Sequence, residues 1–201
     1  MKVLKSCLTI SFFSFWGFCT LQAQDITFDL ENAEFNGSEI CGFPLNSLTN
    51  ILGRPDAIVD SGYIRQELGP EIIYHRYGIN FRAKLIEDDP NKGIHSVIVY
   101  LSRSWDEDHN NHYIAYSGII IPDLNANNKA IEIEEKFSDN IAVTISAEEN
   151  RKKREEWLEI GLEPLESMYF HVIKTDHHKH SLFFYFESVT KFLERIYIEC
   201  H

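Results

Sequence analysis

Basic residues are scarce in this chain. Its 201 residues include 19 Lys and Arg against 31 Asp and Glu, so the formal net charge is −12. An acidic surface repels nucleic acid and anionic lipid and favours either good solvation or a basic partner. The composition therefore argues against a nucleic-acid-binding role and predicts a well-solvated protein.

Long apolar runs are almost missing as well. The one candidate, Cys7–Leu21, follows Lys2 and Lys5 and ends in Leu-Gln-Ala-Gln, the order of a secretory signal peptide. It contains Ser and Thr and is shorter than the roughly 20 apolar residues that a membrane-spanning helix needs. We expect removal of residues 1–24, release into the periplasm or the cell exterior of a bacterium, and no stable membrane insertion. An uncleaved anchor and a lipoprotein are the alternatives.

Cysteine is equally sparse. Two of the four cysteines lie within the predicted signal peptide, which leaves Cys41 and Cys200. In an oxidising compartment a lone pair of cysteines often forms a disulfide, and this one would tie the two ends of the secreted chain together. We expect this bridge; two separate buried thiols are the alternative.

Familiar catalytic signatures are absent from the sequence. It has no Gly-x-Ser-x-Gly elbow, no glycine-rich phosphate loop, no Cys-x-x-Cys and no dinucleotide fingerprint. The carboxylate pairs fall in turns and on exposed faces, where a glycosidase pair would need a cleft. The sequence therefore predicts a protein that is not an enzyme, without a cofactor. An unrecognised hydrolase assembled from Asp60, Ser61 and His75 is an alternative.

Most of the secondary structure that the sequence predicts is β-strand. Alternating or continuous apolar runs predict strands at residues 26–30, 35–40, 72–77, 79–85, 94–101, 118–121, 141–145, 168–174, 182–187 and 195–200. The strand over 79–85 has one wet face, which carries Asn80 and Arg82. Residues 103–116 interrupt the pattern as a polar loop. The sequence predicts an α+β fold of antiparallel β-meanders packed with a few helices.

Two helices are predicted. Apolar residues recur at helical spacing over 45–52, where Pro44 suits the first turn and Gly53 the C-terminal cap. A capping box at Ser146 begins a strongly charged helix that runs to Ile160. Its early turns should project into solvent, and the residues expected to dock are Trp157, Leu158 and Ile160.

No linker divides the secreted chain. Residues 25–201 are predicted to form a single α+β domain, with possible related halves at 25–121 and 122–201. The halves echo each other because each has a helix that leads into an antiparallel meander.

One stretch carries a resemblance to known proteins. Phe43-Pro-Leu-Asn-Ser-Leu-Thr-Asn-Ile-Leu-Gly-Arg-Pro-Asp56, followed by Ile73-Tyr-His-Arg-Tyr-Gly-Ile79, resembles a family of uncharacterised bacterial domains with a helix–Leu-Gly-x-Pro–β-meander pattern. The order is also similar to the small fold shared by β-lactamase-inhibitor proteins and outer-membrane assembly lipoproteins. The resemblance implies that the strand layer is a binding surface and transfers no functional residue.

Two polar turns are rich in metal-ligand side chains. The candidate ligands are His109, His112, His177, His178 and His180. Imidazole suits zinc, copper or nickel, so these turns are candidates for a weak transition-metal site, which would be better defined if the two turns met in space; ordinary loop tips are the alternative. Residues 123–134 have calcium-loop spacing, for which an ion-free Asn-rich turn is the alternative.

The predicted function is that of a secreted or periplasmic, non-enzymatic protein-binding module of unknown partner. An inhibitor, an immunity-type protein and an envelope-assembly factor all fit this description. The alternatives are a metal-binding periplasmic protein that uses the His-bearing turns and an unrecognised hydrolase.

Overall fold

The computed structural model describes residues 26–59, 68–84, 93–106, 111–187 and 190–201. The predicted signal peptide, the Asp60–Ser61 pair and His109 lie outside these residues. Within them, no helix is long and apolar enough to cross a membrane.

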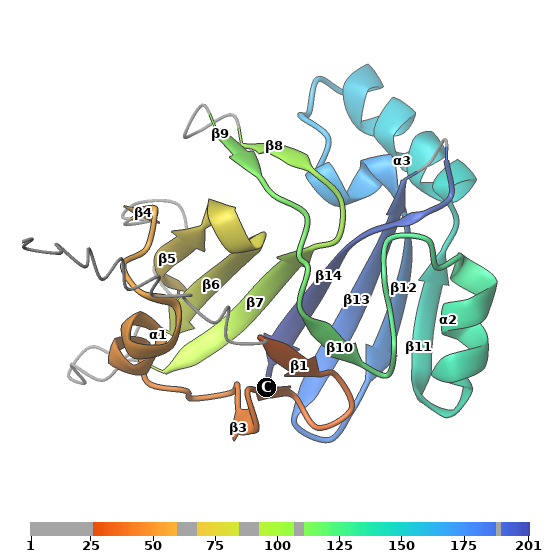
Figure 1. Ribbon diagram of the computed structural model, residues 1–201. Coiled ribbons are helices and arrows are strands. Elements are labelled where there is room, and N and C mark those ends of the chain that lie inside the picture. The colour runs from red at the N-terminus through yellow and green to blue at the C-terminus, as the bar shows by residue number, and fades with distance from the viewer. Residues whose placement is uncertain (1–25, 60–67, 85–92, 107–110, 188–189) are drawn as a thin grey trace, which may run out of the picture.

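An eight-stranded sheet forms the body of the molecule, and all of its neighbouring strands are antiparallel (Figure 1). Its order is β11-β12-β13-β14-β7-β6-β5-β4. The strands are β4 (Ala57–Val59), β5 (Leu68–Tyr74), β6 (Ile79–Lys84), β7 (Ile94–Tyr100), β11 (Ile141–Ile145), β12 (Phe170–Asp176), β13 (His180–Glu187) and β14 (Leu193–Cys200).

Two smaller sheets accompany it. The first has the order β10-β1-β2-β3 and consists of β1 (Thr27–Asp29), β2 (Glu34–Phe35), β3 (Ser38–Glu39) and β10 (Ile119–Ile121). The second is a ribbon of β8 (Ser104–Asp106) and β9 (Asn111–Tyr113), within the stretch predicted as a loop. The helices are α1 (Leu45–Leu52), α2 (Ala130–Lys136) and α3 (Ala147–Glu159), with short 3-10 turns η1 (His75–Tyr77), η2 (Ser138–Asn140) and η3 (Glu166–Tyr169). The predicted α+β fold is confirmed.

The order of elements repeats along the chain. A strand of the small sheet, a helix and a four-stranded meander occur first as β1, α1 and β4–β7, and again as β10, α2 and β11–β14. The last strands of the two meanders, β7 and β14, pair at the centre of the large sheet, and β1 pairs with β10. The sequence predicts no helix at α2, because its Asn-rich approach is typical of a turn. Here Asn128 donates to Glu132 at 2.7 Å and helps to begin the helix.

The hydrophobic core lies between one face of the large sheet and a layer made of the small sheet, α1 and α2 (Figure 1). Strand alternation sends Val97 and Val99 of β7 into this core, while Ser96 and Ile98 point to the opposite side. That opposite side, which we call the open face, carries polar and aromatic side chains from β5, β6, β7, β14 and β13.

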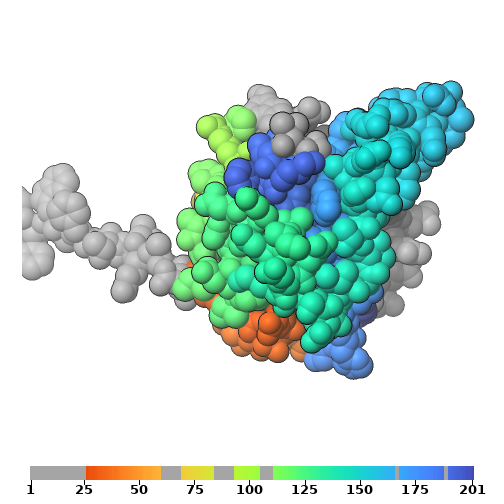
Figure 2. Space-filling model, turned by 90° about the vertical axis from the view of Figure 1, so that its right-hand side faces the viewer, coloured from red at the N-terminus to blue at the C-terminus, as the bar shows by residue number. Residues whose placement is uncertain are grey.

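Helix α3 projects beyond the body of the molecule (Figure 2). It docks through Asn150, which is buried and donates to the Phe170 carbonyl at 2.7 Å. The predicted docking of Leu158 and Ile160 is wrong: they are 57% and 71% exposed, because the last turn extends past the sheet that α3 packs against.

A disulfide joins Cys41, just after β3, to Cys200, the last residue of β14. Their Cα atoms are 5.5 Å apart, within the usual range for a bridge. The bond therefore connects a residue near the beginning of the first half of the chain to the last strand of the second half.

A candidate binding groove on the open face

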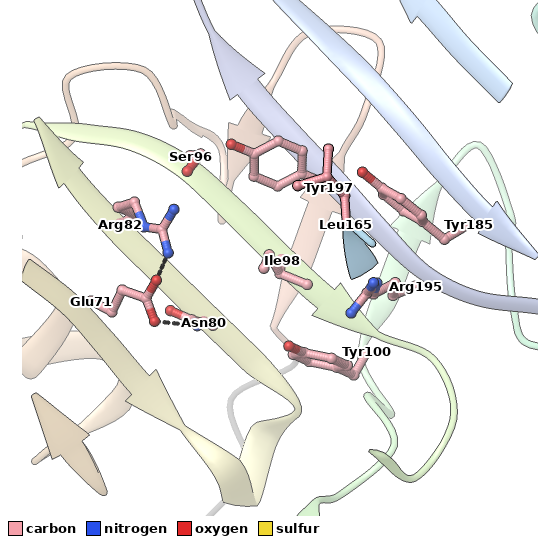
Figure 3. Close-up of a pocket in the computed structure, with 10 residues that line it drawn as sticks. All are labelled: Glu71, Asn80, Arg82, Ser96, Ile98, Tyr100, Leu165, Tyr185, Arg195 and Tyr197. Carbon is pink, nitrogen blue, oxygen red and sulfur yellow. Dashed lines mark hydrogen bonds and ion pairs between the residues drawn. The ribbon is translucent and has the colours of Figure 1, made fainter. Parts of the chain in front are cut away.

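A groove with a volume of about 440 Å³ crosses the open face (Figure 3). Five adjacent strands supply its floor, and Leu165, from the segment between α3 and η3, closes one side. The lining residues are Glu71, Asn80, Arg82, Ser96, Ile98, Tyr100, Leu165, Tyr185, Arg195 and Tyr197. We call this feature the groove.

A polar cluster marks the β5–β6 end of the groove. Arg82 forms an ion pair with Glu71, and Asn80 donates to the same carboxylate at 3.3 Å. Asn80 is only 7% exposed, and among the described residues its Oδ1 finds no hydrogen-bond partner. This end therefore holds one neutralised charge pair and one buried acceptor.

A clamped arginine marks the β14–β13 end. Arg195 is 7% exposed, and its guanidinium carbon lies 4.7 Å from the Phe170 ring centroid and 4.8 Å from that of Tyr185. Cation–π contacts of this kind contribute about 0.5–2 kcal/mol and occupy the faces of the guanidinium. The two rings therefore help to hold the guanidinium of Arg195 in place at this end of the groove.

Ring packing also holds the wall near Arg195. Tyr100 stacks on Tyr113 of β9 with centroids 4.0 Å apart, and His75 packs against Tyr113 at 4.7 Å. Tyr197 lies 5.5 Å from Phe183. The groove is thus walled by aromatic rings held by their neighbours, beside a small apolar floor.

This composition suits binding. Tyr and Arg are the residues most enriched at the energetic centres of protein interfaces, and side chains already held in place lose little entropy on association. The sequence predicted the wet face of β6. It did not predict the groove, because Tyr100 and Arg195 become cross-strand partners only when β7 pairs with β14.

The predicted histidine turns do not meet. β9, which holds His112, and the β12–β13 connection lie at opposite ends of the large sheet (Figure 1). Across the described ranges, no three His, Cys, Asp or Glu side chains group closely enough to hold a metal ion. His112 therefore cannot share a metal site with the histidines of the β12–β13 connection. His109 lies outside the described residues.

The β12–β13 connection uses two of its histidines for packing. The rings of His177 and His180 stack with centroids 4.6 Å apart, and Nε2 of His180 donates to the Leu30 carbonyl at 2.8 Å. Burial lowers the pKa of both histidines, so the neutral forms are favoured. His178 is exposed.

A Ser, a His and an Asp meet nearby, but in an order unsuited to hydrolysis. Ser181 Oγ donates to Asp176 Oδ1 at 2.5 Å and lies 2.7 Å from His201 Nε2. A hydroxyl has one proton; since Asp176 takes that hydrogen bond, His201 must donate to Ser181 rather than accept from it. A serine nucleophile needs the opposite arrangement, and Ser181 is fully buried.

The Asn-rich turn before α2 is held by its own backbone. Asn125 Oδ1 accepts from the Asn127 N–H at 2.9 Å, and Asn128 Oδ1 accepts from the Asn125 N–H at 2.7 Å. The side-chain oxygen of Asn125, at the third position of the calcium-loop spacing, therefore accepts a hydrogen bond that stabilises the turn.

Comparisons with known proteins give only distant similarities. No family model matches the chain, and no curated protein matches it. An extracellular protein containing an SCP domain from Bacillus anthracis str. Ames aligns with 80% of this chain and 44% of its own, at 13% identity and a TM-score of 0.47. A cysteine-rich secretory protein from Staphylococcus aureus subsp. aureus Mu50 aligns with 87% of this chain and 50% of its own, at 12% identity and a TM-score of 0.49. The chain thus spans about half the length of each, and nothing about its function follows from likeness at this level.

Proposed function

We propose that this chain is a secreted or periplasmic, non-enzymatic module that binds a protein partner through the open face of its large sheet. The observation that carries the proposal is the groove, in which tyrosines and a clamped arginine line a surface that the other described residues leave accessible.

An exposed apolar surface adjoins the groove and supports a macromolecular partner. We define the aliphatic patch as Leu158, Ile160, Leu162 and Leu165, which are 50–71% exposed. Leu165 belongs to both the patch and the groove. Exposed apolar side chains commonly mark interaction sites, and these four follow one another along the end of α3 and the segment that leads from it to the groove.

The chemistry of the groove favours binding over catalysis. Its carboxylate, Glu71, is engaged by Arg82 and Asn80, and its remaining polar groups come from Arg, Asn, Tyr and Ser. Inhibition, immunity and envelope assembly would each use such a surface.

The test is a photo-crosslinking amino acid placed at position 197, in the groove, or at 131, on α2. Ile131 is 56% exposed and lies on the other side of the sheet, so it serves as the control. Crosslinking in the native host should give a partner from position 197 alone, and purified partner and mature chain should form a stoichiometric complex. Leu162→Asp should weaken that complex at least about tenfold, whereas Ile131→Asp should not. Equal effects of both substitutions, or no complex from purified components, would contradict the proposal.

A further inference from the structure

We infer that the free edge of β11 binds the same edge of a second copy of this chain, so that the large sheet continues across a two-fold axis. Among the strands that the structure describes, β11 ends the large sheet and pairs with β12 alone. Its outward-directed backbone N–H and C=O groups are those that a further strand would pair with. None of the described residues of β11 lines the groove, so this surface is additional to the one proposed above.

β11 lacks the features that usually protect an edge strand from association. Across the part of the chain that the structure describes, the other edge strands, β3, β4, β8, β9 and β10, are two or three residues long. Pro55 lies just before β4, and Pro122 lies directly after β10. β11 has five residues, Ile-Ala-Val-Thr-Ile, without a charge or a proline. Because short length, charge and proline are the usual protections, β11 is the edge best suited to strand pairing.

The middle of β11 is accessible from both sides of the sheet. Ala142, Val143 and Thr144 are all exposed, and the exposed fraction of Val143 is 46%. Consecutive residues of a strand point to opposite faces. The other described residues therefore leave both faces of this segment open to a neighbouring strand.

The regular part of β11 fixes how two copies meet. The β11–β12 register shifts between Ile141 and Val143 and is regular from Val143 to Ile145. An antiparallel pair centred on Thr144 uses this regular part: Thr144 faces its own copy, and Val143 lies opposite Ile145 of the second copy. Thr144 pairs with Ile173 of the core, so the two aliphatic residues lie on the open-face side. Cross-strand Thr–Thr and β-branched pairs of this kind stabilise antiparallel sheets.

The charges at the two ends of β11 favour a second copy as the occupant. Before the strand, residues 132–139 contain four acidic side chains and one basic side chain; after it, residues 147–154 contain two acidic and four basic ones. Antiparallel pairing brings the start of one β11 beside the end of the other. The acidic segment of each copy then meets the basic segment of the other, and this attraction opposes the repulsion between two acidic chains.

Pairing of this kind also orients the two grooves. Antiparallel neighbours in one sheet are related by a two-fold axis perpendicular to that sheet. The groove and β11 belong to the same sheet. The open faces of both copies therefore lie on the same side, and the dimer presents two grooves to one surface.

The first test is a cysteine crosslink. Cys41 and Cys200 are joined in a disulfide, so Thr144→Cys adds one new thiol to the mature chain. In the inferred pair the Cα atoms of the two copies of residue 144 are about 4.5–5.5 Å apart, within the range of a disulfide. The two copies of residue 142 are about 14 Å apart along the strands, so Ala142→Cys is the matched control. Mild oxidation should give a covalent dimer of Thr144→Cys and not of Ala142→Cys, and equal yields would overturn the inference.

The second test measures self-association of the mature protein by sedimentation, from low micromolar to near-millimolar concentration. Val143→Lys places a charge of the same sign beside Lys174 and should raise the dimer dissociation constant at least about tenfold. Ile58→Lys, at a 65% exposed position on the opposite edge strand β4, should leave it unchanged. If Val143→Lys fails to fold, the crosslink decides.

Two sedimentation results would also overturn the inference. One is a monomer at every concentration. The other is a dimer that Leu162→Asp abolishes and Val143→Lys preserves, because that result places the contact at the aliphatic patch. Either result would leave the proposed function standing, since binding of a partner in the groove does not require pairing through β11.

Discussion

Asn150 attaches the most charged helix of the chain to the large sheet. Its amide donates to the Phe170 carbonyl at the start of β12, and both residues are buried. Removing the donor leaves that carbonyl without its partner, which costs about 1–3 kcal/mol. We therefore expect Asn150→Ala to lower the free energy of unfolding by that amount, measured by urea denaturation. Lys152→Ala, on the exposed side of α3, should stay within about 0.5 kcal/mol. Equal costs for the two variants would contradict this account.

The stacked histidines at the β12–β13 connection should make stability depend on pH. Burial lowers the pKa of both His177 and His180. Nearby carboxylates oppose this shift in part: Glu31 and Asp176 act on His177, and Asp29 acts on His180. In the unfolded chain a histidine takes up its proton near pH 6.5. Below that pH the unfolded state binds more protons than the folded state. Stability is therefore full above about pH 6.5 and falls as the pH drops through the lower folded values.

The measurement is urea denaturation at pH 7.5 and pH 5.5. We expect a smaller free energy of unfolding at pH 5.5 and a reduced difference in His180→Gln, which keeps a donor for the Leu30 carbonyl. His178→Gln changes an exposed histidine in the same turn and should keep the wild-type difference. Asp176 also titrates, but the hydrogen bond from Ser181 lowers the pKa of its carboxyl, so its effect belongs below about pH 4. A wild-type difference that persists in His180→Gln would refute the assignment.

At the scale of elements, the local sequence pattern predicted correctly those helices and strands that have one solvent-exposed face. The alternation over 79–85 and the capping box at Ser146 predicted β6 and α3 correctly, because both signals depend on near neighbours. The ribbon β8–β9 and helix α2 were missed. Each is short and polar at its beginning, so its propensity signal is weak and its surroundings decide its conformation.

The groove was harder to predict from the sequence, because it depends on pairing between strands that are distant in the sequence. Arg195 and Tyr100 are opposite one another in the β14–β7 register although 95 residues separate them in the sequence. No pattern within either strand specifies that register. The predicted layer of strands was therefore correct in kind, while the residues of the site came only from the three-dimensional arrangement.

The end of α3 gives a prediction at the same scale. Ile160 is 71% exposed and Leu162 is 50% exposed, so neither contributes much buried area to the fold. We expect Ile160→Asp combined with Leu162→Asp to change the free energy of unfolding by less than about 1 kcal/mol. The same change should reduce binding of a dye that reports exposed apolar surface. A loss of several kcal/mol would show instead that the patch packs against the protein's own core.

For the molecule as a whole, the two halves share one sheet and one core. β7 from the first half pairs with β14 from the second, and the core draws residues from the small sheet, α1, α2 and both meanders. The groove crosses this central pairing, so its two ends belong to different halves: Glu71 and Arg82 to the first, Tyr185 and Arg195 to the second. The relative placement of the halves therefore sets the geometry of the proposed site.

The disulfide between Cys41 and Cys200 fixes that placement covalently. The bridge spans 159 residues of sequence, so its effect on the unfolded chain is near the upper end for loop closure. Removing a native disulfide typically costs about 2–5 kcal/mol. We expect mature protein to show no free thiol under denaturing, non-reducing conditions, and Cys41→Ala combined with Cys200→Ala to lower the free energy of unfolding within that range. Wild-type protein treated with reductant should match the double variant, because both lack the cross-link and little else differs. Two free thiols per chain would show that the halves are held by β7–β14 pairing and the shared core alone.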